Sequence, residues 1–111
     1  MTMKKGKILV VDDNKGIRDA LKILLGRCFA QVQTIPSPTT LMTTTEEMMP
    51  DVILLDMNFK TDINSGNEGL YWLSEIKKRW PEMPVVLFTA YADIALAVEG
   101  MKRGASDFIV K

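Results

Sequence analysis

The chain has 111 residues, which is the size of a single domain, because a compact domain usually takes about 100–200 residues. Hydrophobic residues make up 47% and charged residues 25% of the chain, close to the values of soluble globular proteins, so a disordered or collagen-like chain is excluded. Fourteen basic residues balance fourteen acidic ones, which leaves no excess positive charge for binding nucleic acid or an anionic membrane.

The residues that the chain lacks exclude several kinds of chemistry. There is no histidine, which removes histidine-based acid–base catalysis, the Ser/His/Asp triad and metal sites that contain histidine. Cys28 is the single cysteine, so an internal disulfide is excluded and nothing indicates an oxidising compartment. The first apolar run, residues 8–11, is too short for a signal peptide or a membrane span, which need roughly 7–15 and about 20 apolar residues. We therefore expect a cytoplasmic protein that does not bind a membrane.

Short apolar blocks recur along the chain and predict the strands of a parallel sheet. Such blocks are nearly continuous because strands of a parallel sheet are covered on both faces. Five strands are expected, of which the second is the weakest and the most peripheral. They span residues 8–11, 30–35, 52–55, 85–88 and 108–110.

Between these blocks the apolar residues recur with the period of a helix. Four helices are predicted, in residues 17–25, 38–49, 70–80 and 94–101. Asp13 or Asn14 is expected to cap the first of them, and Gly26 stands near its end.

The second predicted helix is the poorest of the four. Its five threonines lower the helix propensity, although Ser37 and Pro38 suit the cap and the first position. If it forms, four of its side chains are expected to face inward, namely those of Leu41, Thr45, Met48 and Met49.

The alternation of strands and helices predicts an α/β fold. Strand and helix follow one another four times before a last strand, which implies right-handed crossovers and a parallel sheet with helices on both faces. We expect one domain over residues 1–111, without a linker or an internal repeat. The last helix of such a fold is missing from this chain after Lys111, so we expect part of one sheet face to be bare or covered by a neighbouring molecule.

Chemically active side chains stand at the carboxyl ends of four predicted strands. In open parallel sheets, binding sites form beyond these ends, where the strand order reverses. Asp12 and Asp13 end the first strand, Asp56 the third, Thr89 the fourth and Lys111 the fifth. Each alone has a structural explanation, such as helix capping, but an aspartate ending a buried strand needs compensation for its desolvation. Their joint occurrence favours a functional site.

The chemistry of such a cluster points to a metal ion and phosphoryl transfer. Neighbouring carboxylates repel one another unless a cation neutralises them, and oxygen ligands without histidine or paired cysteine favour Mg²⁺. An ionised aspartate beside a metal ion and a lysine can act as a nucleophile and form an aspartyl phosphate. The charge of Lys111 and the hydroxyl of Thr89 are then available to the phosphoryl oxygens.

Four segments resemble the receiver domain of bacterial two-component response regulators. They are KILVVDDN (residues 7–14), VILLD (52–56), VVLFTA (85–90) and GASDFIVK (104–111), and the similarity spans essentially the whole chain. The resemblance implies a flavodoxin-like, doubly wound five-stranded sheet of order 2-1-3-4-5. It also implies a signalling switch rather than an enzyme, one that catalyses only its own phosphorylation and dephosphorylation.

The resemblance further implies a role for each carboxylate. Asp56 is the expected phospho-acceptor. Asp13 and Asp56 are expected to bind Mg²⁺ directly, together with the backbone carbonyl of Asn58, and Asp12 to act through water.

The phosphoryl-binding and switch residues follow from the same resemblance. Thr89, Ala90 and Lys111 are expected beside the phosphoryl group. Phe108 matches the aromatic switch residue, which turns inward when Thr89 moves toward that group, although it also suits an ordinary strand position.

One segment departs from the family pattern. The usual proline four residues after the acceptor is Lys60 here, and the matching glycine is Gly69. The loop of residues 57–68 is thus longer than usual by about five residues and rich in turn formers, and we expect it to influence access to Asp56 or the choice of kinase.

The resemblance implies protein partners. A sensor histidine kinase or a small phosphodonor supplies the phosphoryl group. The effector lies beyond Lys111, and the ending resembles that of nitrogen-regulator-type transcriptional activators. The surface around the fourth helix and fifth strand is expected to contact an effector or form a homodimer, and this chain itself is not expected to bind DNA.

Three other functions remain open at this level. An aspartyl-phosphate enzyme of the haloacid dehalogenase class would want a second acid where Asn58 stands. A nucleotide- or flavin-binding module would want a glycine-rich cradle, but no G-x-G-x-x-G follows Val11. A degenerate receiver serving only as a protein-interaction module would not need all five key side chains.

Overall fold

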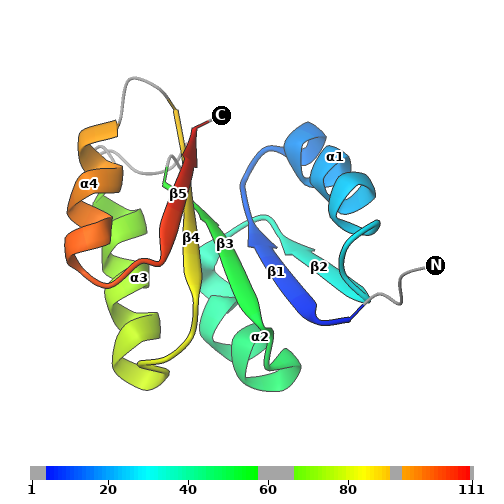
Figure 1. Cartoon of the computed structure of the whole chain (residues 1–111), viewed down its shortest axis with the longest axis horizontal. Coiled ribbons are helices and arrows are strands. Elements are labelled where there is room, and N and C mark those ends of the chain that lie inside the picture. Colours follow the sequence, from blue (N-terminus) through cyan, green and yellow to red (C-terminus); the bar gives the residue numbers. More distant parts are fainter. Residues whose placement is uncertain (1–4, 58–66, 91–93, 111) are drawn as a thin grey trace.

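A five-stranded parallel sheet forms the centre of the fold, with helices on both faces (Figure 1). The computed structural model describes residues 5–57, 67–90 and 94–110. Within these ranges, no helix is long and apolar enough to cross a membrane. The sheet has the order β2-β1-β3-β4-β5, which confirms the predicted flavodoxin-like arrangement. In chain order the elements are β1 (Lys7–Val11), α1 (Lys15–Leu25), β2 (Gln31–Ile35), the 3-10 turn η1 (Pro38–Thr40), α2 (Leu41–Met48), β3 (Val52–Asp56), α3 (Asn67–Arg79), β4 (Val85–Thr89), α4 (Ile94–Lys102) and β5 (Asp107–Val110).

The five predicted strands and four predicted helices are present, and the differences lie at their ends. β3 includes Asp56 and β4 includes Thr89, so these two residues belong to the strands rather than to the following loops. The predicted weak helix is divided into η1 and α2. β2 lies at the edge of the sheet and is only partly buried, as expected of the most peripheral strand.

The prediction that Met49 faces inward is wrong. Leu41, Thr45 and Met48 are buried, but Met49 is 51% exposed. It follows α2 as its C-terminal cap, with a φ of 47° in the left-handed region. This turn carries the chain out of the helical path, so the period that places Met48 inward does not apply to the next residue.

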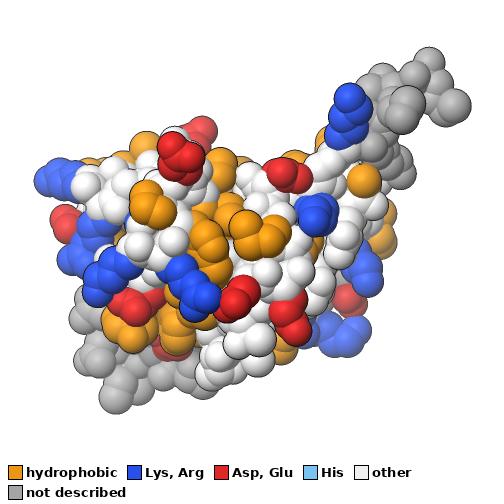
Figure 2. Space-filling view, turned by 90° about the horizontal axis from the view of Figure 1, so that it is seen from below, with side chains coloured by type: hydrophobic (Ala, Val, Ile, Leu, Met, Phe, Trp, Pro, Cys, Tyr) orange, Lys and Arg blue, Asp and Glu red, His pale blue; other side chains and the backbone are white. Residues whose placement is uncertain are grey.

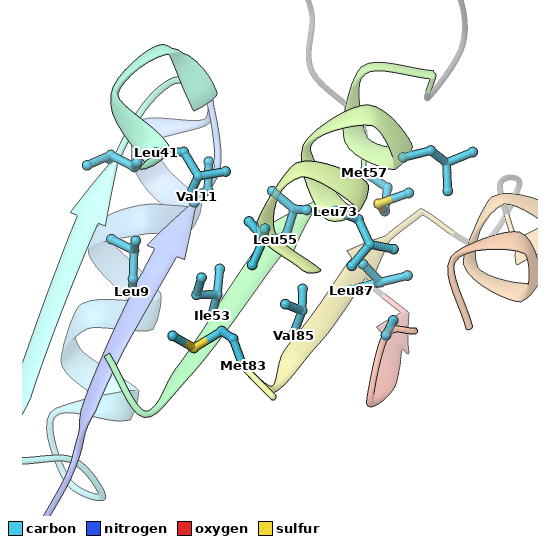
Figure 3. Packing of buried hydrophobic residues seen from close by; sticks show 14 of the residues in the cluster. Leu9, Val11, Leu41, Ile53, Leu55, Met57, Leu73, Met83, Val85 and Leu87 are labelled. Carbon is cyan, nitrogen blue, oxygen red and sulfur yellow. The ribbon is translucent and has the colours of Figure 1, made fainter. Parts of the chain in front are cut away.

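The main core lies on the face covered by α2, α3 and α4. Alternate residues of β1, β3 and β4 point into it, where they meet leucines of α2 and α3 (Figure 3). Residues without any exposed surface in this cluster include Leu9, Val11, Leu41, Ile53, Leu55, Met57, Leu73, Ile76, Val85 and Leu87. These side chains fix the three central strands, whose ends carry the predicted site.

The opposite face has a smaller core beneath α1. Its buried members are Ile8, Val10 and Leu54, and α1 itself has no fully buried residue. On β5, Ile109 lies on this face, because it pairs with Phe88 and alternates with Phe108, and it is 49% exposed.

Asn14 is the N-cap of α1. Its extended backbone (φ −90°, ψ 116°) precedes the helix, and its side-chain Oδ1 accepts a hydrogen bond from the N–H of Ile17 at 3.0 Å. Gly26 ends the same helix as its C-cap. The structure thus selects Asn14 over Asp13 as the cap of α1.

Replacement of Asn14 should weaken α1 through loss of this cap. We expect Asn14→Ala to lower the free energy of unfolding by about 1 kcal/mol in urea denaturation. Asn14→Ser, which keeps a side-chain acceptor, should stay within about half of that loss. Equal losses in the two variants would contradict capping as the cause.

Candidate functional site

Three carboxylates converge at the carboxyl ends of the two central strands. Asp12 and Asp13 follow β1, and Asp56 ends the adjacent strand β3. Val11 pairs with Leu55 in the sheet, so the two strands reach this edge at the same level. One carboxylate oxygen of each residue lies within 4.8 Å of those of the other two. The predicted convergence of these three residues is therefore confirmed.

Burial distinguishes the three carboxylates. Asp12 and Asp56 have no exposed surface, whereas Asp13 is half-buried and stands on the solvent side. Negative charges this close repel one another, and burial strengthens the repulsion because little water screens it. The cluster consequently favours a positive charge in its midst.

The turn between β1 and α1 is fixed by hydrogen bonds around Asp12. The Asp12 N–H donates to the carbonyl of Ile35 at 3.2 Å, and Asp12 Oδ1 accepts from the N–H of Asn14 at 2.9 Å. The guanidinium of Arg18 donates from Nη1 to the Asp12 carbonyl at 2.8 Å. These bonds hold the loop in one shape and leave the carboxylate of Asp13 beside the other two.

Asp56 is held by the strand that carries it. β3 lies between β1 and β4, and Asp56 pairs with Phe88 in the sheet. The next residue, Met57, is completely buried, and its N–H donates to the carbonyl of Phe88 at 2.9 Å. The backbone on both sides of Asp56 is thus fixed to neighbouring structure.

Thr89 and Phe108 lie on one face of the sheet near this edge. Thr89 ends β4 without exposed surface, and its hydroxyl donates to the carbonyl of Ala90 at 3.4 Å. Phe108 pairs with Leu87, two residues before Thr89, and its half-buried ring packs against the main core. Alternation along β4 places Leu87 and Thr89 on the same face, so Phe108 and Thr89 are neighbours across two strands.

Two predicted site residues fall outside the described residues. They are Asn58, expected to supply a backbone carbonyl, and Lys111, expected beside the phosphoryl group. Lys111 directly follows Val110, which pairs with Thr89. Their roles remain predictions, as does the influence of the long loop, of which residues 58–66 lie outside the described ranges.

The donor set fits Mg²⁺. The three residues offer carboxylate oxygens, and Mg²⁺ binds through one or two carboxylates while it keeps several waters. One of the three carboxylates is partly open to solvent, which suits a partly hydrated ion.

Sequence reasoning did not single out Arg18, nor the close approach of Gly69 to Met57, where an added Cβ would lie 3.2 Å from Met57 Cα. Arg18 stands one helical turn after the N-cap, and basic residues are common on exposed helix surfaces, so the pattern gave no reason to choose it. Gly69 was noted only as the family's glycine. Its contact with Met57 depends on how α3 packs and has no local sequence signal.

A hollow of about 630 Å³ lies at the other end of the strands. It is lined by residues that precede β3 and β4, among them Pro50, Trp80 and Pro84. Figure 2, a view of the molecule from below, shows hydrophobic side chains gathered near the middle of this face between charged side chains of both signs. Because the hollow lies at the opposite edge of the sheet, it is separate from the carboxylate site.

Loss of the Arg18 hydrogen bond should destabilise the domain. We expect Arg18→Met to lower the free energy of unfolding by about 1–2 kcal/mol, because the buried Asp12 carbonyl loses a charged donor. Arg27→Met, at an exposed arginine of the same region, should change it by less than about 0.5 kcal/mol in the same urea titration. A similar loss in both variants would count against a specific contact.

The sequence pattern of the response regulator receiver domain matches residues 8–111. The chain is 32% identical to the DNA-binding transcriptional regulator NtrC of Salmonella typhimurium over 109 residues, which are 98% of this chain and 22% of that protein. It is 33% identical to the response regulator protein FleR of Pseudomonas aeruginosa over 108 residues, covering 95% of this chain and 21% of that one. The chain therefore spans about a fifth of the length of these regulators.

Solved structures of receiver domains share the fold. One is the N-terminal signal receiver domain of a two-component response regulator from Bacteroides fragilis, with a TM-score of 0.87 and 55% identity over 97% of this chain and 85% of that chain. Another is the receiver domain of NtrX from Brucella abortus, with a TM-score of 0.83 and 35% identity over 94% of this chain and 84% of that chain. Together with the carboxylate cluster at the sheet edge, these matches show that the chain belongs to the response regulator receiver domain family of two-component systems.

Proposed function

We propose that residues 1–111 act as one receiver domain, a signalling switch in which Asp56 accepts a phosphoryl group. The observation that carries the proposal is the meeting of three carboxylates within 4.8 Å, with Asp56 on the central strand and fully buried. Of the three, only Asp56 lies within a strand, where it pairs with Phe88 of β4, the residue before Thr89. A nucleophile in such a setting is kept in one orientation, which is what phosphoryl transfer chiefly requires.

The proposed metal ligands are Asp13 and Asp56, the backbone carbonyl of Asn58, and Asp12 through water. Bound there, Mg²⁺ would offset the repulsion among the carboxylates and stabilise charge on the phosphoryl oxygens. The protein contributes the fixed positions of the ligands. Asp12 is held by Asn14 and Arg18, and Asp56 by the sheet.

In the proposed reaction, one oxygen of the Asp56 carboxylate attacks phosphorus and forms an acyl phosphate bond. The P–N bond of a kinase phosphohistidine, or the P–O bond of a small donor such as acetyl phosphate, breaks at the same time and its electron pair leaves with the donor. Thr89, Ala90 and Lys111 receive the transferred group through a hydroxyl, the backbone and an ammonium. Water later hydrolyses the acyl phosphate and resets the domain.

The proposed response is a shift between two conformers. The Thr89 hydroxyl moves from its bond with Ala90 toward the phosphoryl group, and Phe108 turns inward on the neighbouring strand. Phosphorylation shifts the equilibrium only as far as the phosphoryl group binds one conformer better than the other. The half-buried position of Phe108 beside the core is compatible with both an inward and an outward rotamer.

We propose a sensor histidine kinase as donor and a transcriptional effector as the target of the switch. NtrC is named as a DNA-binding transcriptional regulator, and the match covers only its receiver-like fifth. DNA binding is thus assigned to the effector and not to this domain. Transfer of the phosphoryl group from the kinase would take place in the cytoplasm. The surface of α4 and β5 would form a homodimer.

The acceptor is tested by replacement of Asp56. With Mg²⁺ and acetyl phosphate, the wild-type chain should gain one phosphoryl group by intact-mass measurement, and Asp56→Asn should gain none because the amide is not a nucleophile for phosphorus. Asp19→Asn, at an exposed carboxylate of α1, should react like the wild type.

Labelling of Asp56→Asn to the wild-type level would contradict the assignment of the acceptor. Repeated turnover of a phosphate ester by the wild type would instead favour an aspartyl-phosphate enzyme. Beryllofluoride, which mimics the phosphoryl group without transfer, should perturb the amide signals of Thr89 and Phe108 in the wild type only.

Metal binding is tested by stability. At a Mg²⁺ concentration of 100 times its dissociation constant, the free energy of unfolding should rise by about 2.7 kcal/mol, and EDTA should reverse the gain. Asp13→Asn should lose most of this gain, while Asp19→Asn should keep it. A gain that survives Asp13→Asn in full would place the ion elsewhere.

A further inference from the structure

Gly69, in the first turn of α3, lies directly against the residue that follows the proposed acceptor. A Cβ atom added at Gly69 would lie 2.9 Å from Met57 Sδ, 3.2 Å from Met57 Cε and 3.2 Å from Met57 Cα. These distances are shorter than ordinary carbon contacts of about 3.5–4.0 Å. The helix can therefore approach Met57 this closely because residue 69 has no side chain.

Met57 has little freedom to yield to an added atom. It is completely buried in the main core, which also contains Leu70 and Leu73 of α3. Figure 3 labels Met57 and Leu73 in this cluster. Its N–H donates to the carbonyl of Phe88 at 2.9 Å, which ties its backbone to β4. Rotation of the methionine side chain would relieve the contacts at Sδ and Cε but not the contact at Cα.

Any backbone shift at Met57 passes to Asp56 through the peptide bond. Asp56 contributes to a cluster in which three carboxylate oxygens lie within 4.8 Å of one another. At such separations, a displacement of a fraction of an ångström changes which oxygens can share one ion. The close approach of Gly69 to Met57 thus places the first turn of α3 directly beside the residue that follows the acceptor.

We propose that Gly69 is a positioning residue for Asp56. Because Gly69 has no side chain, α3 can pack closely on Met57 and hold it against β4. The position of Met57 in turn sets the position of the Asp56 carboxylate. The proposal rests on the proposed function, since it assigns Gly69 a part in metal binding and phosphoryl acceptance. It predicts that Gly69 tolerates no larger residue without a loss at the carboxylate site, even where the fold persists.

The first test uses Gly69→Ala in metal-free protein and follows hydrogen exchange of individual amides. The Met57 amide should lose about tenfold or more of its protection, because its bond to Phe88 is disturbed. The Asp12 amide, bonded to Ile35 at the end of the neighbouring strand, should stay within about twofold of the wild type. Equal loss at both amides, or no loss at Met57, would overturn the proposal.

The second test measures Mg²⁺ affinity and the rate of labelling by acetyl phosphate. Gly69→Ala should weaken both by about tenfold or more, since small misplacements of reacting groups carry penalties of this size. Lys78→Ala, at an exposed position near the C-terminal end of the same helix, is the control. It should stay within about twofold of the wild type, and an equal loss there would overturn the proposal.

A double variant keeps the test decisive if Gly69→Ala folds poorly. Met57→Ala combined with Gly69→Ala removes Sδ and Cε, the atoms of two of the three short contacts. Because the contact at Cα remains, the double variant should recover only part of the affinity lost in Gly69→Ala, measured relative to Met57→Ala alone, so the two substitutions should be non-additive. Independent, additive effects would overturn the contact as the cause.

The failure of the proposed function can be told apart from the failure of this inference. Wild-type protein that neither binds Mg²⁺ nor accepts a phosphoryl group would refute the proposed function. The hydrogen-exchange result at Met57 does not depend on that outcome, and it tests separately whether Gly69 positions Met57.

Discussion

The repulsion among three carboxylates is the constraint on which the rest of the site depends. Asp12, Asp13 and Asp56 bring their oxygens within 4.8 Å of one another, and two of these residues have no exposed surface. Ionised groups this close repel one another. They stay together because each belongs to a strand end or turn that the parallel sheet fixes. A cation bound among these carboxylates would offset the repulsion.

The stiffness that opposes this repulsion comes from the main core. Leu9 and Val11 of β1, and Ile53 and Leu55 of β3, pack on the helices of one face and hold the two central strands in register. At the strand ends, hydrogen bonds then hold the backbone that carries the carboxylates. The arrangement resembles a common device of protein sites, in which functional groups are supported by hydrogen bonds and packing behind them. Arg18 supports the turn of Asp12, and Met57 supports Asp56.

The two faces of the sheet differ in how well they are packed. The core beneath α1 is small, α1 buries no residue completely, and Ile109 on β5 is half exposed. Thr89 and Phe108, the proposed switch residues, lie on the better packed face, where a movement of Phe108 would reach the contacts of β5 with β4 and α4. The site and the surfaces it would control are therefore linked through the last two strands.

The amino-acid sequence determined the helices and strands and indicated the three carboxylates that meet at the sheet edge. Continuous apolar blocks identified the strands, and the strand-end positions of Asp56 and Thr89 followed from where those blocks stop, because period and length are local properties. The strand order came only with the family resemblance, since periodicity does not tell which strands pair. Only the tertiary structure decided that Asn14 and not Asp13 caps α1, that Met49 turns outward, that Arg18 bonds the Asp12 carbonyl and that Gly69 lies against Met57. Each of these depends on a backbone turn or a close approach between segments far apart in the chain, and such contacts leave no periodic trace in the sequence.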